Sequence, residues 1–403
     1  MLLAVASLVF LLVAGSFTVG YLALAALARR VPGAPPRPAA GVPAHSFAIL
    51  IPAHNEEAVL ARVLRSCQQL DYPRERYQVF VIADHCTDAT VAVARSHGVQ
   101  CLERDGNAPR GKGAALGWAL ARIEGFDGYV IVDADCTLDC HALKEFDRLF
   151  TAGHRVLQTN NVAGNPDDSF TSYLAAVANR LENEFFYRPK SHHGLTVFLR
   201  GTGMVLHREV LARCPWEADG QVEDSTYTLA LLRAGERVTF VGSVRVVSDF
   251  PISGEELRRQ RRRWVGGNLA VARREVPRLV VEAWRRRSWL LLDAAWTLLA
   301  NIRSLVLLVL GAGLLLAAAA ALIAPGPLAV AAVGLGLGLV FLNGIYFALG
   351  VLSLGLTRQR LRYLLAAPQT AAFMLALALT GLLRRSAPPW LLSVRRPQVG
   401  TDA

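Results

Sequence analysis

Charged side chains are missing from two long stretches of this 403-residue sequence, residues 1–28 and residues 304–356. An uncharged, apolar stretch of about 20 residues is long enough to cross a bilayer as a helix. We therefore predict transmembrane helices in the first stretch and in each half of the second. The chain is 53% apolar, and the concentration of apolar residues in these regions excludes a single soluble globule.

No basic residue precedes the first apolar stretch, whereas Arg29 and Arg30 follow it directly. A secretory signal peptide begins with a basic region, so this pattern favours an uncleaved anchor, although Ala26-Leu27-Ala28 has the form of a cleavage site. By the positive-inside rule, the N-terminus is then outside and residues 29 onward are cytoplasmic. The predicted location is the inner or plasma membrane of the cell, with several spans and a cytoplasmic catalytic domain.

The six cysteines include no CxxC pair, and the GxxxxGK[ST] spacing of a P-loop is also absent. Paired cysteines at that spacing are typical of zinc sites and redox-active thiols, so neither is predicted here. The cysteines are expected to stay reduced in the cytosol. Without a P-loop, any phosphate site must be built in another way.

The formal charge of +11 is localised, because residues 258–287 hold eleven arginines against Glu275 and Glu282. Nucleic-acid binding is one interpretation of such a cluster. Its position just before the second apolar region favours instead a membrane face that carries anionic lipids. Membrane lipids are therefore the expected partner, and nucleic acid is not.

Between the apolar regions, short apolar runs alternate with helical patterns. The runs Phe47–Pro52, Tyr77–Ala83, Val99–Glu103 and Tyr129–Val132 predict four buried strands. Strands that alternate with helices at this spacing are typical of a Rossmann-like, doubly wound, mostly parallel α/β sheet. The predicted organisation is a transmembrane helix over 1–28, a Pro-rich linker over 29–45, the α/β domain over 46–250, a basic segment with interfacial helices over 251–303, two transmembrane helices over 304–356, and an in-plane or re-entrant helix with a cytoplasmic tail over 357–403.

Acidic and basic residues follow several of these strands, at what should be one edge of the sheet. Asp133 and Asp135 follow the fourth strand and suit a divalent cation with oxygen ligands, although an Asp-rich turn is the plainer interpretation. Asp84 follows the second strand and can accept hydrogen bonds from a base or ribose. Lys112, between two glycines at a helix start, places an ammonium and free backbone N–H groups near a phosphate. Together these residues predict a nucleoside diphosphate site with a metal ion.

Three further motifs lie beyond residue 195. Gly201-Thr202-Gly203 interrupts an apolar run, which indicates either a β-bulge or a close approach of a ligand or another backbone. Glu223 and Asp224 begin a helix, where Asp224 is either an N-cap or a functional carboxylate. Gln260, Arg263 and Trp264 lie on a basic helix whose arginines otherwise suit a membrane surface.

The motifs IPAHNEE (51–57), ADHCTD (83–88), RGKG (110–113), DAD (133–135), GTG (201–203), ED (223–224) and QRRRW (260–264) occur in this order. In this respect the chain resembles membrane-bound family 2 glycosyltransferases of the QxxRW type, the group that includes cellulose, chitin and hyaluronan synthases. The resemblance covers roughly residues 45–270. It implies a GT-A fold, a nucleotide-sugar donor, and Mg²⁺ or Mn²⁺.

The resemblance also implies roles for individual residues. Asp224, next to Glu223, would be the general base of an inverting reaction. His85 and Cys86 stand where Gly-Ser is frequent in the family, which leaves the base of the nucleotide open, with a UDP-sugar expected. By motif, the donor is contacted by Pro52, His54, Asn55, Glu56, Asp84, Lys112 and Asp133, the metal by Asp133 and Asp135, and the diphosphate or acceptor by Gly201, Thr202, Gly203, Gln260, Arg263 and Trp264.

Three functions follow as alternatives. The first is transfer of a sugar to a lipid-linked or saccharide acceptor at the cytoplasmic membrane face. The second is a processive polysaccharide synthase, for which about three spans per chain would require an oligomer or a partner protein to form the channel. The third is an inactive membrane scaffold, which the presence of every expected acidic residue disfavours.

Overall fold

The computed structural model describes residues 1–32, 43–107, 109–217 and 222–383. The middle of the predicted Pro-rich linker and the end of the predicted C-terminal tail lie outside the described residues. The described chain forms two compact units. The helical unit contains Met1–Val31, Asn165–Leu195 and residues 250–383, and the sheet unit contains the described part of Pro32–Gly164 together with Thr196–Asp249. The stretch for which we predicted one α/β domain is thus interrupted by a segment that groups with the long helices.

The predicted strands form the parallel half of the sheet. They are β1 (Phe47–Ala53), β2 (Tyr77–Asp84), β3 (Gln100–Arg104) and β4 (Gly128–Ile131), in the spatial order β3-β2-β1-β4. All three pairings among them are parallel. Strands buried on both faces need continuous apolar sequence, and in β1 the side chains from Phe47 to Ile51 are all fully buried.

The helices between these strands are α2 (Leu60–Gln68), α3 (Thr90–Ser96) and α4 (Lys112–Leu120), with a short 3₁₀ turn η1 (Arg74–Arg76) before β2. The first of these helices does not continue directly from the end of β1. Asn55 has a φ of 56°, and the backbone N–H of Glu56 donates to the side chain of Thr90, 2.8 Å away. The turn after β1 is therefore held by the neighbouring loop, and α2 begins later.

The other half of the sheet is mixed rather than parallel. It contains β5 (Cys136–Leu138), β6 (Val156–Ala163), β7 (Met204–His207) and β8 (Val238–Ser248), which complete the described order β3-β2-β1-β4-β7-β6-β8-β5. β7 is antiparallel to β4 because the chain enters it from the Gly201–Gly203 turn, at the carboxyl end of β4, and runs back along it. Helices α5 (Ala142–Thr151), α8 (Arg208–Arg213) and α9 (Glu223–Arg233) complete the sheet unit.

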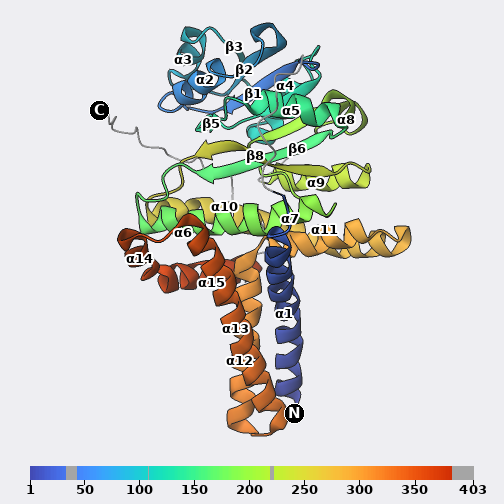
Figure 1. The fold of residues 1–403 in the computed structure, drawn as a ribbon, viewed down its shortest axis with the longest axis vertical. Coiled ribbons are helices and arrows are strands. Elements are labelled where there is room, and N and C mark those ends of the chain that lie inside the picture. Colours follow the sequence, from blue (N-terminus) through green and yellow to red (C-terminus); the bar gives the residue numbers. More distant parts are fainter. Residues whose placement is uncertain (33–42, 108, 218–221, 384–403) are drawn as a thin grey trace. The chain divides into compact units, whose positions relative to one another are not determined.

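Three described helices are long and apolar enough to cross a membrane: α1 (Leu2–Ala28), α12 (Arg303–Ile323) and α13 (Pro327–Leu354). They pack side by side, as Figure 1 shows, around Leu11, Leu310 and Leu339. Polar contacts join them as well, since Ser7 Oγ donates to the carbonyl oxygen of Gly313 at 2.9 Å. Which end of each helix faces the cytoplasm remains a prediction.

Further helices of this unit run across the ends of these three (Figure 1). They are α6 (Phe170–Glu182), which continues through the π-helical turn η2 (Asn183–Tyr187) into α7 (Arg188–His192), then α10 (Gly254–Arg286) and α11 (Trp289–Ala300). The basic helix α10 extends over 33 residues to Arg286, with Pro277 inside it. Asp293 of α11, a carboxylate in an otherwise apolar helix, accepts a hydrogen bond from Lys190 of α7.

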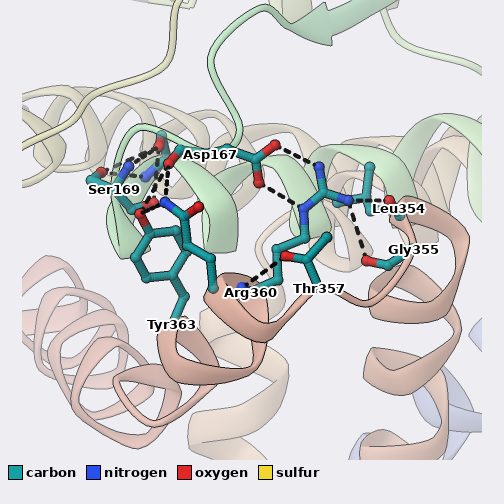
Figure 2. Close-up of polar contacts among 9 residues, drawn as sticks. Asp167, Ser169, Leu354, Gly355, Thr357, Arg360 and Tyr363 are labelled. Atoms are coloured by element: carbon teal, nitrogen blue, oxygen red, sulfur yellow. Dashed lines mark hydrogen bonds and ion pairs between the residues drawn. The ribbon is translucent and has the colours of Figure 1, made fainter.

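Figure 2 shows how the end of α13 is fixed to the loop before α6. Arg360 donates from Nε and Nη2 to the two carboxylate oxygens of Asp167, both at 2.7 Å. Tyr363 donates its hydroxyl to the carbonyl oxygen of Asp167 at 2.9 Å. Both residues belong to α14 (Arg358–Leu364), which leads into α15 (Ala367–Leu383).

α14 and α15 meet at a bend of 43°, and the count of described spans rises from three to four if the pair is one broken span. We predicted an in-plane or re-entrant helix here. In the helical unit α15 lies alongside α10: Arg258 lies over the ring of Phe373 at 5.3 Å, and Arg273 donates to the carbonyl oxygen of Gly381 at 3.4 Å. These contacts place the C-terminal helix beside the basic helix, as predicted, whereas its in-plane arrangement stays a prediction.

Candidate active site

The loops after β1 and β2 are joined to each other at the carboxyl edge of the sheet. Pro52 lies in β1 opposite Ile82 of β2. His54 Nδ1 lies 2.5 Å from the carbonyl oxygen of Asp84. The side-chain oxygen of Asn55 accepts a hydrogen bond from the backbone N–H of Thr87 at 2.8 Å. Four of the predicted donor residues, Pro52, His54, Asn55 and Glu56, therefore lie beside the Asp84 loop.

Asp84 lies in the centre of a buried polar network. One carboxylate oxygen of Asp84 accepts hydrogen bonds from Arg104 and from Nδ1 of His85, which is 2.8 Å away. The other oxygen accepts a hydrogen bond from the backbone N–H of Gly111 at 3.2 Å. Asp84 and Arg104 are only 5% and 4% exposed. Arg104 was missed in the sequence, although it faces Asp84 directly in the β2–β3 register. The network ties the end of β2 to the glycine turn before α4.

Lys112 is the first residue of α4, after Gly111 with a φ of 126°. Its Nζ donates to Oδ1 of Asp133 and to the carbonyl oxygen of Gly201, 2.8 Å away. The ammonium thus links the DAD and GTG motifs. Burial opposes its charge, but the carboxylates of Asp133, Glu223 and Asp224 outweigh burial and raise the pKa of Lys112.

The Gly201-Thr202-Gly203 turn packs directly against the same site. The N–H of Asp133 donates to Thr202 Oγ1 at 3.0 Å. Gly203 has a φ of 64°, and a Cβ there would lie 1.8 Å from the hydroxyl oxygen of Thr159, so no other residue fits. A Cβ at Gly201 would lie 3.3 Å from Lys112 Nζ and 3.6 Å from Asp224 Oδ2. Gly201 therefore keeps open the space between the ammonium and the carboxylate.

Glu223 and Asp224 occupy the first turn of α9. Asp224 is not the N-cap, a position that Val222 holds, although its carboxylate accepts the adjacent N–H of Ser225 at 2.7 Å. Burial, with the like charge of Glu223, raises the pKa of Asp224 to about 7. A carboxyl group with a pKa near neutrality is well matched to accepting a proton from a hydroxyl group.

Asp133 and Asp135 follow β4, and the side chain of Asp133 is 34% exposed. Among the described residues, no group of three or more His, Cys, Asp or Glu side chains is arranged to hold a metal ion. Two carboxylates alone fit a hard cation that takes its other ligands from a diphosphate and water, as Mg²⁺ does in many nucleotide sites. The donor set therefore fits a cation that is shared with the substrate.

Gln260, Arg263 and Trp264 lie on one stretch of α10, in the helical unit. The guanidinium of Arg261 lies over the ring of Trp264 at 5.3 Å. Closure of these three side chains over a diphosphate in the sheet unit remains a prediction. The remaining predicted site residues all belong to the sheet unit.

A family model described as "Glycosyltransferase like family 2" matches residues 43–267, more than half of the chain and all of the motifs above. The chain belongs to glycosyltransferase family 2. This finding confirms the family that the motifs indicated.

Curated family 2 relatives agree over the same region. The beta-monoglucosyldiacylglycerol synthase of Synechocystis is 27% identical over 57% of this chain and 49% of its own length. A probable glycosyltransferase of Bacillus subtilis is 25% identical over 55% of each chain. The chain thus spans about half the length of these relatives. They are not cellulose, chitin or hyaluronan synthases, with which the motifs had suggested a relationship.

The fold of this family 2 chain is shared with a solved structure. This structure is a mannosyltransferase from Pyrobaculum calidifontis, determined in complex with GDP-Man and Mn²⁺. The match covers 94% of this chain and 100% of the mannosyltransferase, with a TM-score of 0.57 and 20% sequence identity. The likeness confirms the predicted GT-A-type α/β sheet combined with long apolar helices.

Proposed function

We propose that this chain is an inverting glycosyltransferase that moves a hexose from a nucleoside diphosphate sugar to a hydroxyl group of a membrane lipid. The observation that carries the proposal is the arrangement around Gly201. Lys112, which contacts Asp133 and is suited to a diphosphate, and the Asp224 carboxylate both lie close to the Cβ position of this glycine, at 3.3 Å and 3.6 Å.

Each residue has a chemical task in this reaction. Asp224 accepts the proton of the acceptor hydroxyl, whose oxygen then bonds to the anomeric carbon as the bond to the diphosphate breaks. Lys112 stabilises the negative charge that grows on the leaving diphosphate. When bound by Asp133 and Asp135, Mg²⁺ or Mn²⁺ would supply further charge neutralisation at the diphosphate.

Inversion follows from having one carboxylate in place to act as a base. Glu223 is adjacent to Asp224 on α9, and neighbouring residues of a helix project in different directions. Glu223 is therefore placed to raise the pKa of Asp224 rather than to act as a second nucleophile. A single in-line displacement inverts the anomeric carbon.

A lipid acceptor is supported by two observations. The same chain carries three helices that are long and apolar enough to cross a membrane. Relatives over the catalytic region are named for glucosylation of diacylglycerol. A polysaccharide channel would need more spans than the described residues contain, so a processive synthase would require an oligomer or partner.

The full chain in lipid nanodiscs tests this proposal. UDP-glucose, UDP-galactose, UDP-N-acetylglucosamine and GDP-mannose are each offered with diacylglycerol or with an oligosaccharide, and release of nucleoside diphosphate is measured. We expect release with a UDP-hexose and diacylglycerol, its loss in EDTA, and its return with Mn²⁺ or Mg²⁺. The glycolipid should carry the anomeric configuration opposite to that of the donor. Release with the oligosaccharide alone would contradict the lipid acceptor, and a retained configuration would contradict inversion.

A further inference from the structure

Lys112 makes both of its described polar contacts within the site. Nζ donates to Asp133 Oδ1 and to the carbonyl oxygen of Gly201. Its side chain is 24% exposed, so the ammonium is partly shielded from water. It therefore occupies one of the two carboxylates to which a divalent cation would bind.

A free cation would meet a weak site here. Asp133 and Asp135 supply two carboxylates, and the described chain offers no group of three or more metal-ligating side chains. The ammonium on Asp133 also repels any cation that approaches the same oxygen, since like charges a few ångströms apart are strongly unfavourable where water is partly excluded. On these contacts alone, a cation without a nucleotide should bind poorly.

We propose that Lys112 holds the Asp133 carboxylate in place of a divalent cation until a nucleoside diphosphate enters, so that cation and nucleotide bind cooperatively. The inference rests on the proposed function only in taking a diphosphate as the ligand. The phosphate oxygens offer Lys112 a new partner, and Asp133 then becomes available to the cation. Because binding coupling is reciprocal, the cation must favour the nucleotide by the same factor.

The charges around Lys112 support this exchange. Glu223 and Asp224 act on the ammonium in addition to its hydrogen-bond partner Asp133, so Asp133 is not its only source of electrostatic stabilisation. A diphosphate adds further negative charge beside it, so Lys112 can turn away from Asp133 without losing its electrostatic stabilisation. The carbonyl oxygen of Gly201 can remain its partner in both arrangements.

The deciding experiment measures Mn²⁺ alone. The full chain in phosphatidylcholine nanodiscs is titrated with Mn²⁺, and free Mn²⁺ is followed by electron paramagnetic resonance, with empty nanodiscs as the blank. We expect Lys112→Met to bind Mn²⁺ on the order of tenfold more tightly than wild type, because a like charge has been removed and Asp133 released. Lys112→Arg, which keeps the charge, should stay as weak as wild type. Asp133→Asn combined with Asp135→Asn should abolish binding at this site.

A second titration adds UDP, and separately GDP. In the wild type, the nucleotide should increase the affinity for Mn²⁺. In Lys112→Met, this increase in Mn²⁺ affinity should be small or absent, and the nucleotide itself should bind more weakly. Lys112→Gln repeats both measurements if the methionine variant lacks a thermal unfolding transition. Mn²⁺ affinity in Lys112→Met that equals or falls below the wild-type value overturns the inference. Failure of both nucleotides to bind the wild type would contradict the proposed donor, whereas the comparison with Mn²⁺ alone would still decide the role of Lys112.

Discussion

Two lysine–aspartate contacts in this protein behave in opposite ways. In the sheet unit, Lys112 meets Asp133 with Glu223 and Asp224 close by, and these carboxylates raise the pKa of the lysine. In the helical unit, Lys190 contacts Asp293, and burial lowers the pKa of Lys190 despite that partner. Three carboxylates act on the lysine of the first cluster, where Arg200 also acts on Asp224, whereas the second is a contact between one lysine and one aspartate.

The difference separates a reactive site from a structural contact. Three carboxylates around one ammonium leave groups that can bind a cation or take a proton, and such perturbed groups gather at functional sites. A lysine–aspartate pair whose lysine is completely buried mainly fixes α7 against α11. The lysine also lies 5.4 Å from the ring centroids of both Phe186 and Trp296, which encloses it further. Variants in the two clusters should therefore change different properties.

The largest effect is expected from Asp224→Asn. The amide cannot accept the proton, so transfer should fall by about 10³-fold, within the range for a lost general base. Thermal stability should not fall, because a buried carboxylate beside Glu223 has been removed. Nucleoside diphosphate binding, measured by calorimetry, should stay near the wild-type value. Turnover like that of the wild type would contradict the assignment of the base.

Gly201→Ala tests the space between the two charged groups. The methyl group would lie 3.3 Å from Lys112 Nζ, and the residue has a φ of 77°. Displacement of the ammonium by even a fraction of an ångström should lower transfer on the order of 10²-fold. Gly125→Ala is the matched control, since its φ is 87° and no atom lies within 4 Å of the Cβ position. Equal losses in both variants would attribute the effect to backbone strain alone.

The Lys190–Asp293 pair should respond in stability instead. Lys190→Met leaves the Asp293 carboxylate without its ammonium, and breaking a buried pair in this way costs about 3 kcal/mol. Thermal unfolding in nanodiscs should shift downward, while transfer per folded molecule stays unchanged. Combining Lys190→Met with Asp293→Leu should recover much of the loss, because the carboxylate that lost its ammonium is then absent as well. A loss of turnover without a loss of stability would assign Lys190 to the catalytic machinery.

The sequence could predict the parts of this molecule that depend on neighbouring residues. Asp84, Lys112 and Asp133 each follow a recognisable strand or begin a helix, and parallel strands bring their carboxyl ends to one edge. Contacts between distant segments could not be found in this way. Arg104 depends on the register of β2 against β3, and the Lys190–Asp293 pair joins residues 103 apart in the chain.

The mixed half of the sheet was missed for a similar reason. A run such as residues 197–206 has the same composition whether its strand is parallel or antiparallel. The direction of β7 is set by the place where the chain turns, at Gly201 and Gly203, whose positive φ angles are permitted by glycine. Only four residues, Met204–His207, pair as a strand there. The preceding residues form the turn that lies against Asp133.

The smallest expected effect is the pH dependence of kcat/KM for the donor, which reports the ionisation of the free enzyme. Asp224 must be deprotonated to act as the base, and its pKa is raised to about 7 by burial and by Glu223. Activity should therefore rise with pH and level off above neutrality. Because only about a tenth of such a group is ionised one unit below its pKa, kcat/KM at pH 6 should be roughly tenfold below the plateau. Glu223→Gln removes the neighbouring like charge, so the acidic limb should move to lower pH if Asp224 is the titrating group. An acidic limb that stays in place in Glu223→Gln would assign the titration to another residue and remove the main electrostatic argument for Asp224 as the base.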